Sequence, residues 1–292
     1  MVVAVRMLVV GCGSIGRRHI ANLIGLGVPA EDITAVDVPS ALEVLPESVV
    51  RYPIVETPVE LAKPVVFAAI LVCSPFDRHL SWAADACQQQ TALFIEKPLG
   101  SLDELPRWRT LAAKFDALAL VTQVGYQLRF HPAAQALTSI TSPVIGRFTC
   151  DAEMASWPGQ SYGPMLLEMS HEIDLALASG ASSERVSVDI LTDTRAVFSL
   201  CGEGRRWRID LNGQASSYHR SWYVANGGMH VEVSIDQPDA LGADMYRAEM
   251  GHFLNAVRTG KQSGPAATLA DGVKVLEICQ SVMETHGAQL SR

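Results

Sequence analysis

The chain has 292 residues, 48% of them apolar and 18% charged, with a formal net charge of −8. This length can bury a full core and favours two domains over one. The acidic balance argues against nucleic acid or an anionic membrane as the main partner, because both attract basic patches. A phosphate-bearing ligand stays possible, since helix N-termini bind phosphate without net positive charge.

Six cysteines are scattered along the chain, and none forms a CxxC pair or has a histidine at metal-ligand spacing. This arrangement predicts free thiols in a reducing cytosol and no metal site. The N-terminal segment Met1–Val10 lacks a cleavage-site pattern, and the longest apolar run, Val65–Cys73, is far too short to cross a bilayer. We therefore expect a soluble, cytoplasmic protein with no membrane partner.

The first part of the chain alternates strand-like and helix-like segments. Short apolar runs predict strands buried on both faces, with helices between them. The expected strands are Met7–Val10, Ile33–Val36, Val65–Val72, Ala92–Ile95 and Leu118–Thr122, and the expected helices are Ser14–Gly25, Arg78–Gln89 and Leu102–Lys114. Such alternation means parallel strands joined by crossovers, hence a doubly wound α/β domain over residues 1–122.

The second part, residues 123–292, has short strands separated by turn residues such as Asn212-Gly213. The expected strands are Val144–Ala155, Val186–Leu191, Ala196–Leu200, Arg206–Leu211, Tyr218–Val224 and Met229–Ile235. One helix, Met165–Ser179, interrupts them, and two more close the chain, one ending before Gly260 and one starting at Thr268. This pattern predicts an α+β domain with an open, mainly antiparallel sheet.

A glycine-rich turn, Gly11-Cys12-Gly13-Ser14-Ile15-Gly16, follows the first strand. Strand, GxGxxG, helix and an acidic residue at the end of the next strand form the dinucleotide fingerprint. That acidic residue is Asp37, which lies 21 residues after Gly16. Its carboxylate would accept hydrogen bonds from the adenosine ribose and repel a 2′-phosphate. The sequence therefore predicts NAD as the cofactor, with NADP less favoured.

Further motifs follow in a fixed order along nearly the whole chain. They are Arg17-Arg18-His19, Ser74-Pro75 with His79, Glu96-Lys97-Pro98-Leu99, Tyr126-Gln127-Leu128-Arg129-Phe130-His131-Pro132, Ser170-His171-Glu172-Ile173-Asp174, and a closing segment from Phe253 to Gly272. With the glycine turn, this series resembles the Gfo/Idh/MocA family of glucose–fructose oxidoreductases and inositol dehydrogenases. Members of that family mostly oxidise or reduce sugars, cyclitols and sugar nucleotides.

The resemblance implies an N-terminal NAD(P)-binding domain and a C-terminal domain for substrate binding and oligomerisation, with the cofactor between them. It makes Lys97 the catalytic lysine and predicts a cis peptide bond between Lys97 and Pro98. The cofactor contacts are then expected from Gly11, Cys12, Gly13, Ser14, Ile15, Gly16, Asp37, Cys73, Ser74, Pro75, His79, Glu96 and Lys97. Substrate contacts are expected from Lys97, Tyr126, Arg129 and His171.

Many family members carry an aspartate four residues before the histidine that matches His171, whereas this chain has Leu167 there. Glu168 lies three residues before His171, and residues i and i+3 are neighbours on a helix, so Glu168 could replace the missing carboxylate. Asp174 could share that face.

We expect His171 to accept the hydroxyl proton and Lys97 to orient and stabilise the oxygen, although the two roles can be exchanged. Structural alternatives stay open for His171 on an apolar helix stripe and for Asp174. His79 could be a solvated histidine at a helix start, and Arg129 could form a salt bridge between the two domains.

The leading interpretation is an NAD(P)-dependent dehydrogenase or reductase that moves a hydride between nicotinamide and a carbinol or carbonyl carbon. The substrate would be a sugar, cyclitol, sugar acid or sugar nucleotide, and the C-terminal sheet would form a homodimer or homotetramer. Two alternatives stay open. One is a non-catalytic dinucleotide-binding sensor, which the absence of the usual aspartate at Leu167 leaves open. The other is a reductase of a non-sugar imine or enone.

Overall fold

The computed structural model describes residues 5–53, 66–140, 142–153, 165–181, 184–236 and 244–290. The chain divides into two compact units. The first unit comprises Met1–Gly125 and Tyr246–Ala270, and the second comprises Tyr126–Met245 and Asp271–Arg292. The contiguous division expected from the sequence, 1–122 and 123–292, differs from this one at residues 123–125 and at residues 246–270, both of which belong to the first unit.

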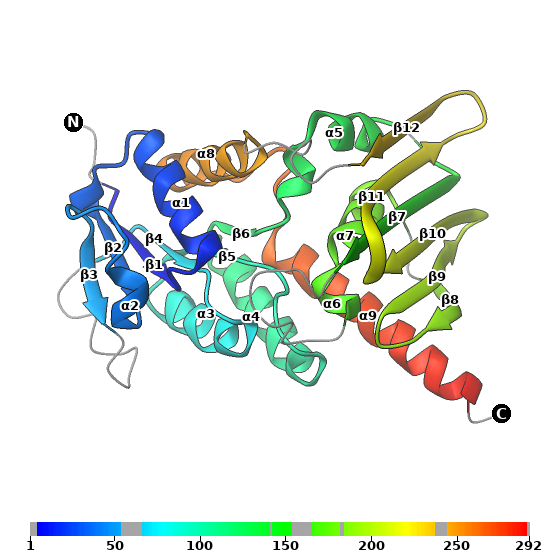
Figure 1. Cartoon of the computed structure of the whole chain (residues 1–292), viewed down its shortest axis with the longest axis horizontal. Helices are drawn as coiled ribbons and strands as arrows, with labels where there is room; N and C mark the ends of the chain where they lie inside the picture. Colours follow the sequence, from blue (N-terminus) through cyan, green and yellow to red (C-terminus); the bar gives the residue numbers. More distant parts are fainter. Residues whose placement is uncertain are drawn as a thin grey trace. The chain divides into compact units, whose positions relative to one another are not determined.

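A six-stranded parallel sheet forms the centre of the first unit, with strand order β3-β2-β1-β4-β5-β6 (Figure 1). The strands are β1 (Met7–Val10), β2 (Ile33–Asp37), β3 (Val50–Pro53), β4 (Ala69–Val72), β5 (Ala92–Ile95) and β6 (Thr122–Val124). This is the order of a dinucleotide-binding doubly wound fold, and its ligand crevice lies where the order reverses, between β1 and β4. The predicted α/β class of the first part is confirmed.

Helices cover both faces of this sheet. In Figure 1, α1 (Ser14–Gly25) and α8 (Asp244–Thr259) lie on one side of it, and α3 (His79–Gln88) and α4 (Leu105–Ala117) lie on the other. On the α1 side, Phe253 and Leu254 of α8 join the same buried cluster as Leu23 of α1 and Met7 of β1. Burial of these apolar side chains is the main force that holds α8 to the first unit.

A mixed sheet forms the second unit, with order β12-β11-β7-β10-β9-β8 (Figure 1). Its strands are β7 (Ile145–Glu153), β8 (Arg185–Leu191), β9 (Arg195–Gly202), β10 (Arg205–Asn212), β11 (Gln214–Ala225) and β12 (His230–Ile235). All neighbouring pairs are antiparallel except β7 with β10. Trp207 and Trp222 are fully buried, so they fill the core; Trp157 lies outside the described residues. The mainly antiparallel sheet is confirmed.

The helices of the second unit are α5 (Pro132–Thr138), α6 (Met165–Glu168), α7 (His171–Ala178) and α9 (Leu269–Leu290). The sequence predicted one helix over 165–179, but a turn at Met169–Ser170 divides it into α6 and α7. Both helices continue the same apolar spacing, so periodicity alone does not show the break.

Other differences are local. The expected strand Leu118–Thr122 begins instead at Thr122, because α4 runs to Ala117 and Ala119 takes a left-handed φ of 51°. The short helix α2 (Pro39–Leu42), the edge strand β3 and α5 were not predicted. Residue 65 and residues 154–155, which the predicted strands included, lie outside the described residues.

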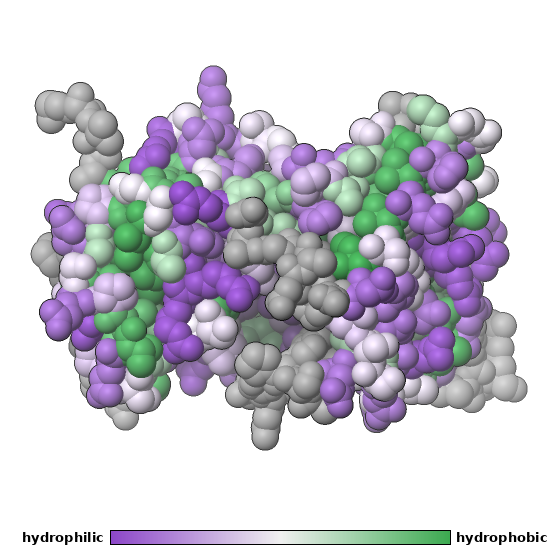
Figure 2. Space-filling model, turned by 45° about the horizontal axis from the view of Figure 1, so that its top comes forward, coloured by the Kyte–Doolittle hydropathy of each residue, from purple (hydrophilic) through white to green (hydrophobic). Residues whose placement is uncertain are grey.

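In the part of the chain that the structure describes, no helix has both the length and the apolarity to cross a membrane. Figure 2 shows hydrophilic side chains over much of the visible surface, with hydrophobic patches among them. Beside the turn between β11 and β12, the exposed side chains of Val144, Ile145 and Met229 line an open hollow of about 340 Å³.

Candidate active site

Three candidate segments follow neighbouring strands of the parallel sheet. Gly11 comes directly after β1, Cys73 after β4 and Glu96 after β5. The strands are in parallel register, with Val10 opposite Val72 and Val72 opposite Ile95, so these segments meet at one edge of the sheet. In open α/β sheets this carboxyl edge is where ligands bind.

The three glycines of the turn occupy three different environments. Gly11 has φ +89°, and a Cβ there would lie 2.5 Å from the backbone of Cys73 and Ser74. A Cβ at Gly16 would lie 1.9 Å from the carbonyl oxygen of Gly11, so only glycine lets α1 approach β1 this closely. A Cβ at Gly13 would meet no described atom within 4 Å. That open side fits close approach by a pyrophosphate to the backbone at the N-terminus of α1.

The difference in space around Gly16 and Gly13 predicts different results for their alanine variants. Gly16→Ala places a methyl group against backbone, so we expect the first unit to lose about 3 kcal/mol of unfolding free energy, the upper end for overpacking. Gly13→Ala has space and should lose less than about 0.5 kcal/mol, as at an ordinary surface position. It should nevertheless weaken NAD binding, since its methyl group occupies the open side. Chemical denaturation and calorimetric NAD titration measure both quantities; a Gly16→Ala protein of normal stability would contradict the packing argument.

Asp37 fixes the end of β2 to the glycine turn. Its Oδ2 accepts a hydrogen bond from the backbone N–H of Cys12 at 2.5 Å, and its Oδ1 accepts one from Val38 at 2.6 Å. Of the two arginines that follow the turn, Arg18 stacks on the Tyr246 ring at 4.4 Å, and Arg17 approaches the carbonyl oxygen of Cys12 at 3.4 Å. The carboxylate at the end of β2 is therefore held beside the turn.

The cysteines next to the turn are buried thiols. Burial, with a smaller effect of Asp37, raises the pKa of Cys12 to about 12. Burial also raises the pKa of Cys73 well above its ordinary value. Both thiols are therefore protonated at neutral pH, and neither is a nucleophile. All six cysteines are free, as predicted, and five are buried; Cys201 is half-buried.

His79 is buried at the start of α3, not solvated as one reading of the sequence suggested. Its Nε2 lies 2.8 Å from the carbonyl oxygen of Ser74, and its Nδ1 lies 3.3 Å from that of Leu99. Burial lowers its pKa, which favours the neutral ring at neutral pH. His79 thus links the loop after β4 to the loop after β5.

Lys97 follows Glu96, the first residue after β5, and is half-buried. Its peptide bond to Pro98 is cis, as the resemblance implied. The backbone N–H of Lys97 donates to Oε2 of Glu96 at 3.2 Å, and Oε1 of Glu96 lies 2.7 Å from Nε2 of His19. Motif analysis assigned no separate role to His19 or to Glu249 of α8, and Glu249 lies near both His19 and Glu96. The signal available in the sequence for Glu249 was its spacing: it lies three residues after Tyr246 and directly before Met250, both on the apolar stripe of that helix.

In the second unit, His171 begins α7 and is buried. Its ring lies edge-on to that of Tyr126, with the centroids 5.6 Å apart. Glu168 ends α6 and is half-buried, while Leu167 is a core residue with 2% exposure. Glu168 and His171 therefore belong to two helices, and the single helical face that suggested their partnership is not present.

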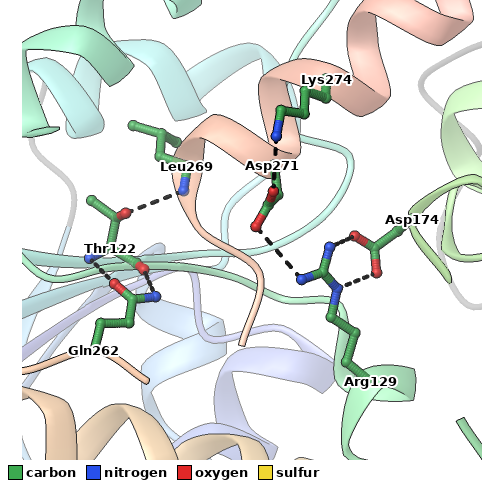
Figure 3. A network of polar contacts seen from close by, with 7 residues as sticks. All are labelled: Thr122, Arg129, Asp174, Gln262, Leu269, Asp271 and Lys274. Carbon is green, nitrogen blue, oxygen red and sulfur yellow. Dashed lines mark hydrogen bonds and ion pairs between the residues drawn. The ribbon is translucent and has the colours of Figure 1, made fainter. Parts of the chain in front are cut away.

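Arg129 and Asp174 form a buried ion pair within the second unit (Figure 3). The guanidinium donates from Nε to Oδ2 at 2.9 Å and from Nη2 to Oδ1 at 2.7 Å, a bidentate arrangement. A second carboxylate, Asp271 of α9, lies 3.5 Å from Nη1. Arg129 therefore forms an ion pair, but within the second unit and not between the domains as one interpretation of the sequence had it. The pair joins the segment after Tyr126 to α7 and α9.

Figure 3 also shows how the start of β6 is fixed in the first unit. The side-chain amide of Gln262 bonds both backbone groups of Thr122, with the Thr122 N–H donating to Oε1 at 3.2 Å. The hydroxyl oxygen of Thr122 accepts from the backbone N–H of Leu269 at 3.1 Å. These bonds tie the segment after α8 to the sheet.

The strand order, the three glycines and the carboxylate at the end of β2 define a dinucleotide-binding α/β protein. Residues 5–126 match the model of a family described as an oxidoreductase family with an NAD-binding Rossmann fold. The matched part of the chain, residues 5–126, is an NAD-binding Rossmann domain of the Gfo/Idh/MocA oxidoreductase type.

Among curated proteins, the chain is 30% identical over 186 residues to scyllo-inositol 2-dehydrogenase (NAD(+)) of Bacillus subtilis. The aligned region covers 59% of this chain and 53% of that protein. The chain thus spans about half the length of this relative. It is 24% identical to the rhizopine catabolism protein MocA of Rhizobium meliloti, over 98% of this chain and 96% of that protein. The structure of scyllo-inositol dehydrogenase from Lactobacillus casei with NAD(H) and scyllo-inositol matches with a TM-score of 0.79 at 17% identity, over 97% and 96% of the two chains. This last similarity concerns the fold.

Proposed function

We propose that this protein is an NAD-dependent dehydrogenase or reductase that acts on a CH–OH carbon of a cyclitol or sugar. The observation that carries the proposal is the position of Lys97, at the carboxyl end of β5 and on the same sheet edge as the glycine turn. The name of one curated relative, an inositol dehydrogenase, supports a cyclitol-like substrate.

Each residue has a defined part in this proposal. The backbone of the glycine turn holds the pyrophosphate, and Asp37 accepts the ribose hydroxyls. Bound NAD supplies the nicotinamide ring that accepts the hydride from the carbinol carbon. Lys97 hydrogen-bonds the substrate oxygen, and His171 takes the hydroxyl proton, as a positioned base. Tyr126 contacts the His171 ring and orients it. Asp174 has a structural role, because it forms the ion pair with Arg129.

The test is a screen of inositols, sugars, sugar acids and sugar nucleotides for NAD reduction, and of the matching ketones for NADH oxidation. We expect turnover with at least one polyhydroxylated ring and its loss in Lys97→Ala. Tight NADH binding without turnover on any substrate would instead support the dinucleotide-binding sensor, which the core leucine at 167 keeps in consideration. Turnover only with imines or enones would support the remaining alternative.

The preference for NAD over NADP has its own test. Removing the charge of Asp37 removes its repulsion of a 2′-phosphate. A repulsion of about 1.4 kcal/mol corresponds to a tenfold change in a dissociation constant. We therefore expect Asp37→Asn to reduce the ratio of NADP to NAD dissociation constants by about tenfold. Asn keeps an oxygen that can accept the Cys12 N–H, whereas Asp37→Ala loses that bond and should also weaken binding of NAD itself. An unchanged ratio in both variants would show that Asp37 does not select the cofactor.

Self-association through the C-terminal sheet stays a prediction. The exposed apolar side chains around the β11–β12 turn, Val144, Ile145 and Met229, support it, since patches of this kind mark contact surfaces. The molar mass in solution, measured by light scattering, decides between a monomer, a dimer and a tetramer.

A further inference from the structure

Three ionisable side chains meet inside the first unit, beneath the strand end that carries Lys97. They are His19 of α1, Glu96 after β5 and Glu249 of α8, and their ligand-type atoms all lie within 4.8 Å of one another. His19 and Glu249 are 0% exposed and Glu96 is 7% exposed. Buried charges are costly unless they are paired, so this group needs an explanation.

The Glu96 carboxylate is held on several sides. Oε1 lies 2.7 Å from Nε2 of His19, and Oε2 accepts the backbone N–H of Lys97 at 3.2 Å. The carboxylate also packs against Gly125, where a Cβ would come within 2.7 Å of Oε2. Nδ1 of His19 has no hydrogen-bond partner among the described residues, so the ring proton is assigned to Nε2, which donates to Glu96.

The ring of His19 is itself fixed by aromatic neighbours. It lies edge-on to Phe94 with a centroid separation of 4.9 Å, and 6.3 Å from the ring of Tyr246. His19 stands three residues after Gly16, on the helix whose N-terminus faces the cofactor turn. The bond from His19 to Glu96 therefore connects the cofactor-binding helix to the residue next to Lys97.

We propose that His19 is a positioning residue: through its buried hydrogen bond to Glu96 it fixes the backbone of Lys97 relative to the cofactor-binding helix. This inference rests on the proposed function, in which Lys97 touches the substrate oxygen. A hydrogen bond to a carboxylate in a buried environment is about twice as strong as a neutral one. Loss of the donor therefore removes a strong restraint on the position of the Glu96 carboxylate. The Lys97 amide, bonded to the same carboxylate, moves with it.

The test compares His19→Leu with His19→Gln, because glutamine can still donate to Glu96. We expect His19→Leu to lower kcat about ten- to hundredfold, the effect of a misplacement near 1 Å, while the Kd for NAD changes less than about threefold. His19→Gln should recover most of the kcat. The matched control is Leu23→Ala, which truncates a buried residue one turn further along α1; it should lower the melting temperature and leave kcat of the folded protein unchanged.

A second readout does not depend on turnover. Hydrogen exchange of the Lys97 amide, followed by mass spectrometry of the peptide that contains it, should accelerate in His19→Leu more than in Leu23→Ala. If wild-type protein turns over no polyol, the proposed function fails, while the exchange data still test the link. Normal kcat and normal exchange in His19→Leu would overturn the inference.

The same three residues are also of the kinds that bind metal ions. Metal analysis of the purified wild-type protein, with and without chelator treatment, therefore belongs to the experiment. A stoichiometric metal whose removal reproduces the kinetics of His19→Leu would replace the positioning role by a metal site.

Discussion

Lys97→Ala is expected to bind NAD with a Kd within about threefold of the wild type and to lose about 10²- to 10⁴-fold in turnover, the contribution of a positioned proton-transfer or hydrogen-bonding group. Binding survives because the glycine turn and Asp37, not the lysine side chain, hold most of the dinucleotide. The Lys97 N–H that donates to Glu96 is a backbone group, so alanine keeps it. Steady-state kinetics and calorimetric titration with NAD give the two numbers.

Lys97→Met is the matched variant, because it keeps an unbranched stem of similar length and removes the amine alone. It should behave as Lys97→Ala does. Lys97→Arg keeps the charge but offers a planar fork in place of a point donor, so we expect partial activity at best. Turnover near the wild-type value in both Lys97→Ala and Lys97→Met would exclude the lysine from the chemistry and return the choice to His171 alone.

Arg129→Met is expected to cost the second unit about 3–5 kcal/mol of unfolding free energy, because it leaves the fully buried carboxyl group of Asp174 without its bidentate partner. Asp174→Asn should cost less, since the amide oxygen can still accept one of the two bonds. The double variant Arg129→Met/Asp174→Leu should recover much of the loss, because replacing a whole buried pair by apolar groups is often neutral. Because the chain has two units, the transitions must be followed separately, by calorimetry or by hydrogen exchange.

Arg208→Met is the control for this experiment. Arg208 pairs with Asp189 at 2.6 Å in the same unit, but both side chains are 40% or more exposed. Exposed pairs contribute about 0–1 kcal/mol, so the melting temperature should barely change. Should Arg129→Met instead melt normally and raise only the KM for substrate, the substrate-contact alternative for Arg129 would replace the structural one.

Much of the first unit followed from local pattern. Met7–Val10 and Ser14–Gly25 agree with β1 and α1 at both ends, because a strand buried on both faces and an amphipathic helix each leave a distinct periodicity. The glycine positions were also readable, since the fingerprint states a separate steric requirement for each of them. The return of 246–270 to the first unit was not readable, because packing between distant segments leaves no local trace.

The sequence by itself determined the fold class, the cofactor class and the position of Lys97, because these depend on backbone conformation and spacing within short segments. Only the tertiary structure decided which polar groups are paired. It placed Arg129 on Asp174, turned both nitrogens of His79 toward carbonyl oxygens, and brought His19 and Glu249 to Glu96. Such partners come from elements far apart in the chain, and burial selects them by the free-energy cost of an unpaired polar group, which no single segment encodes.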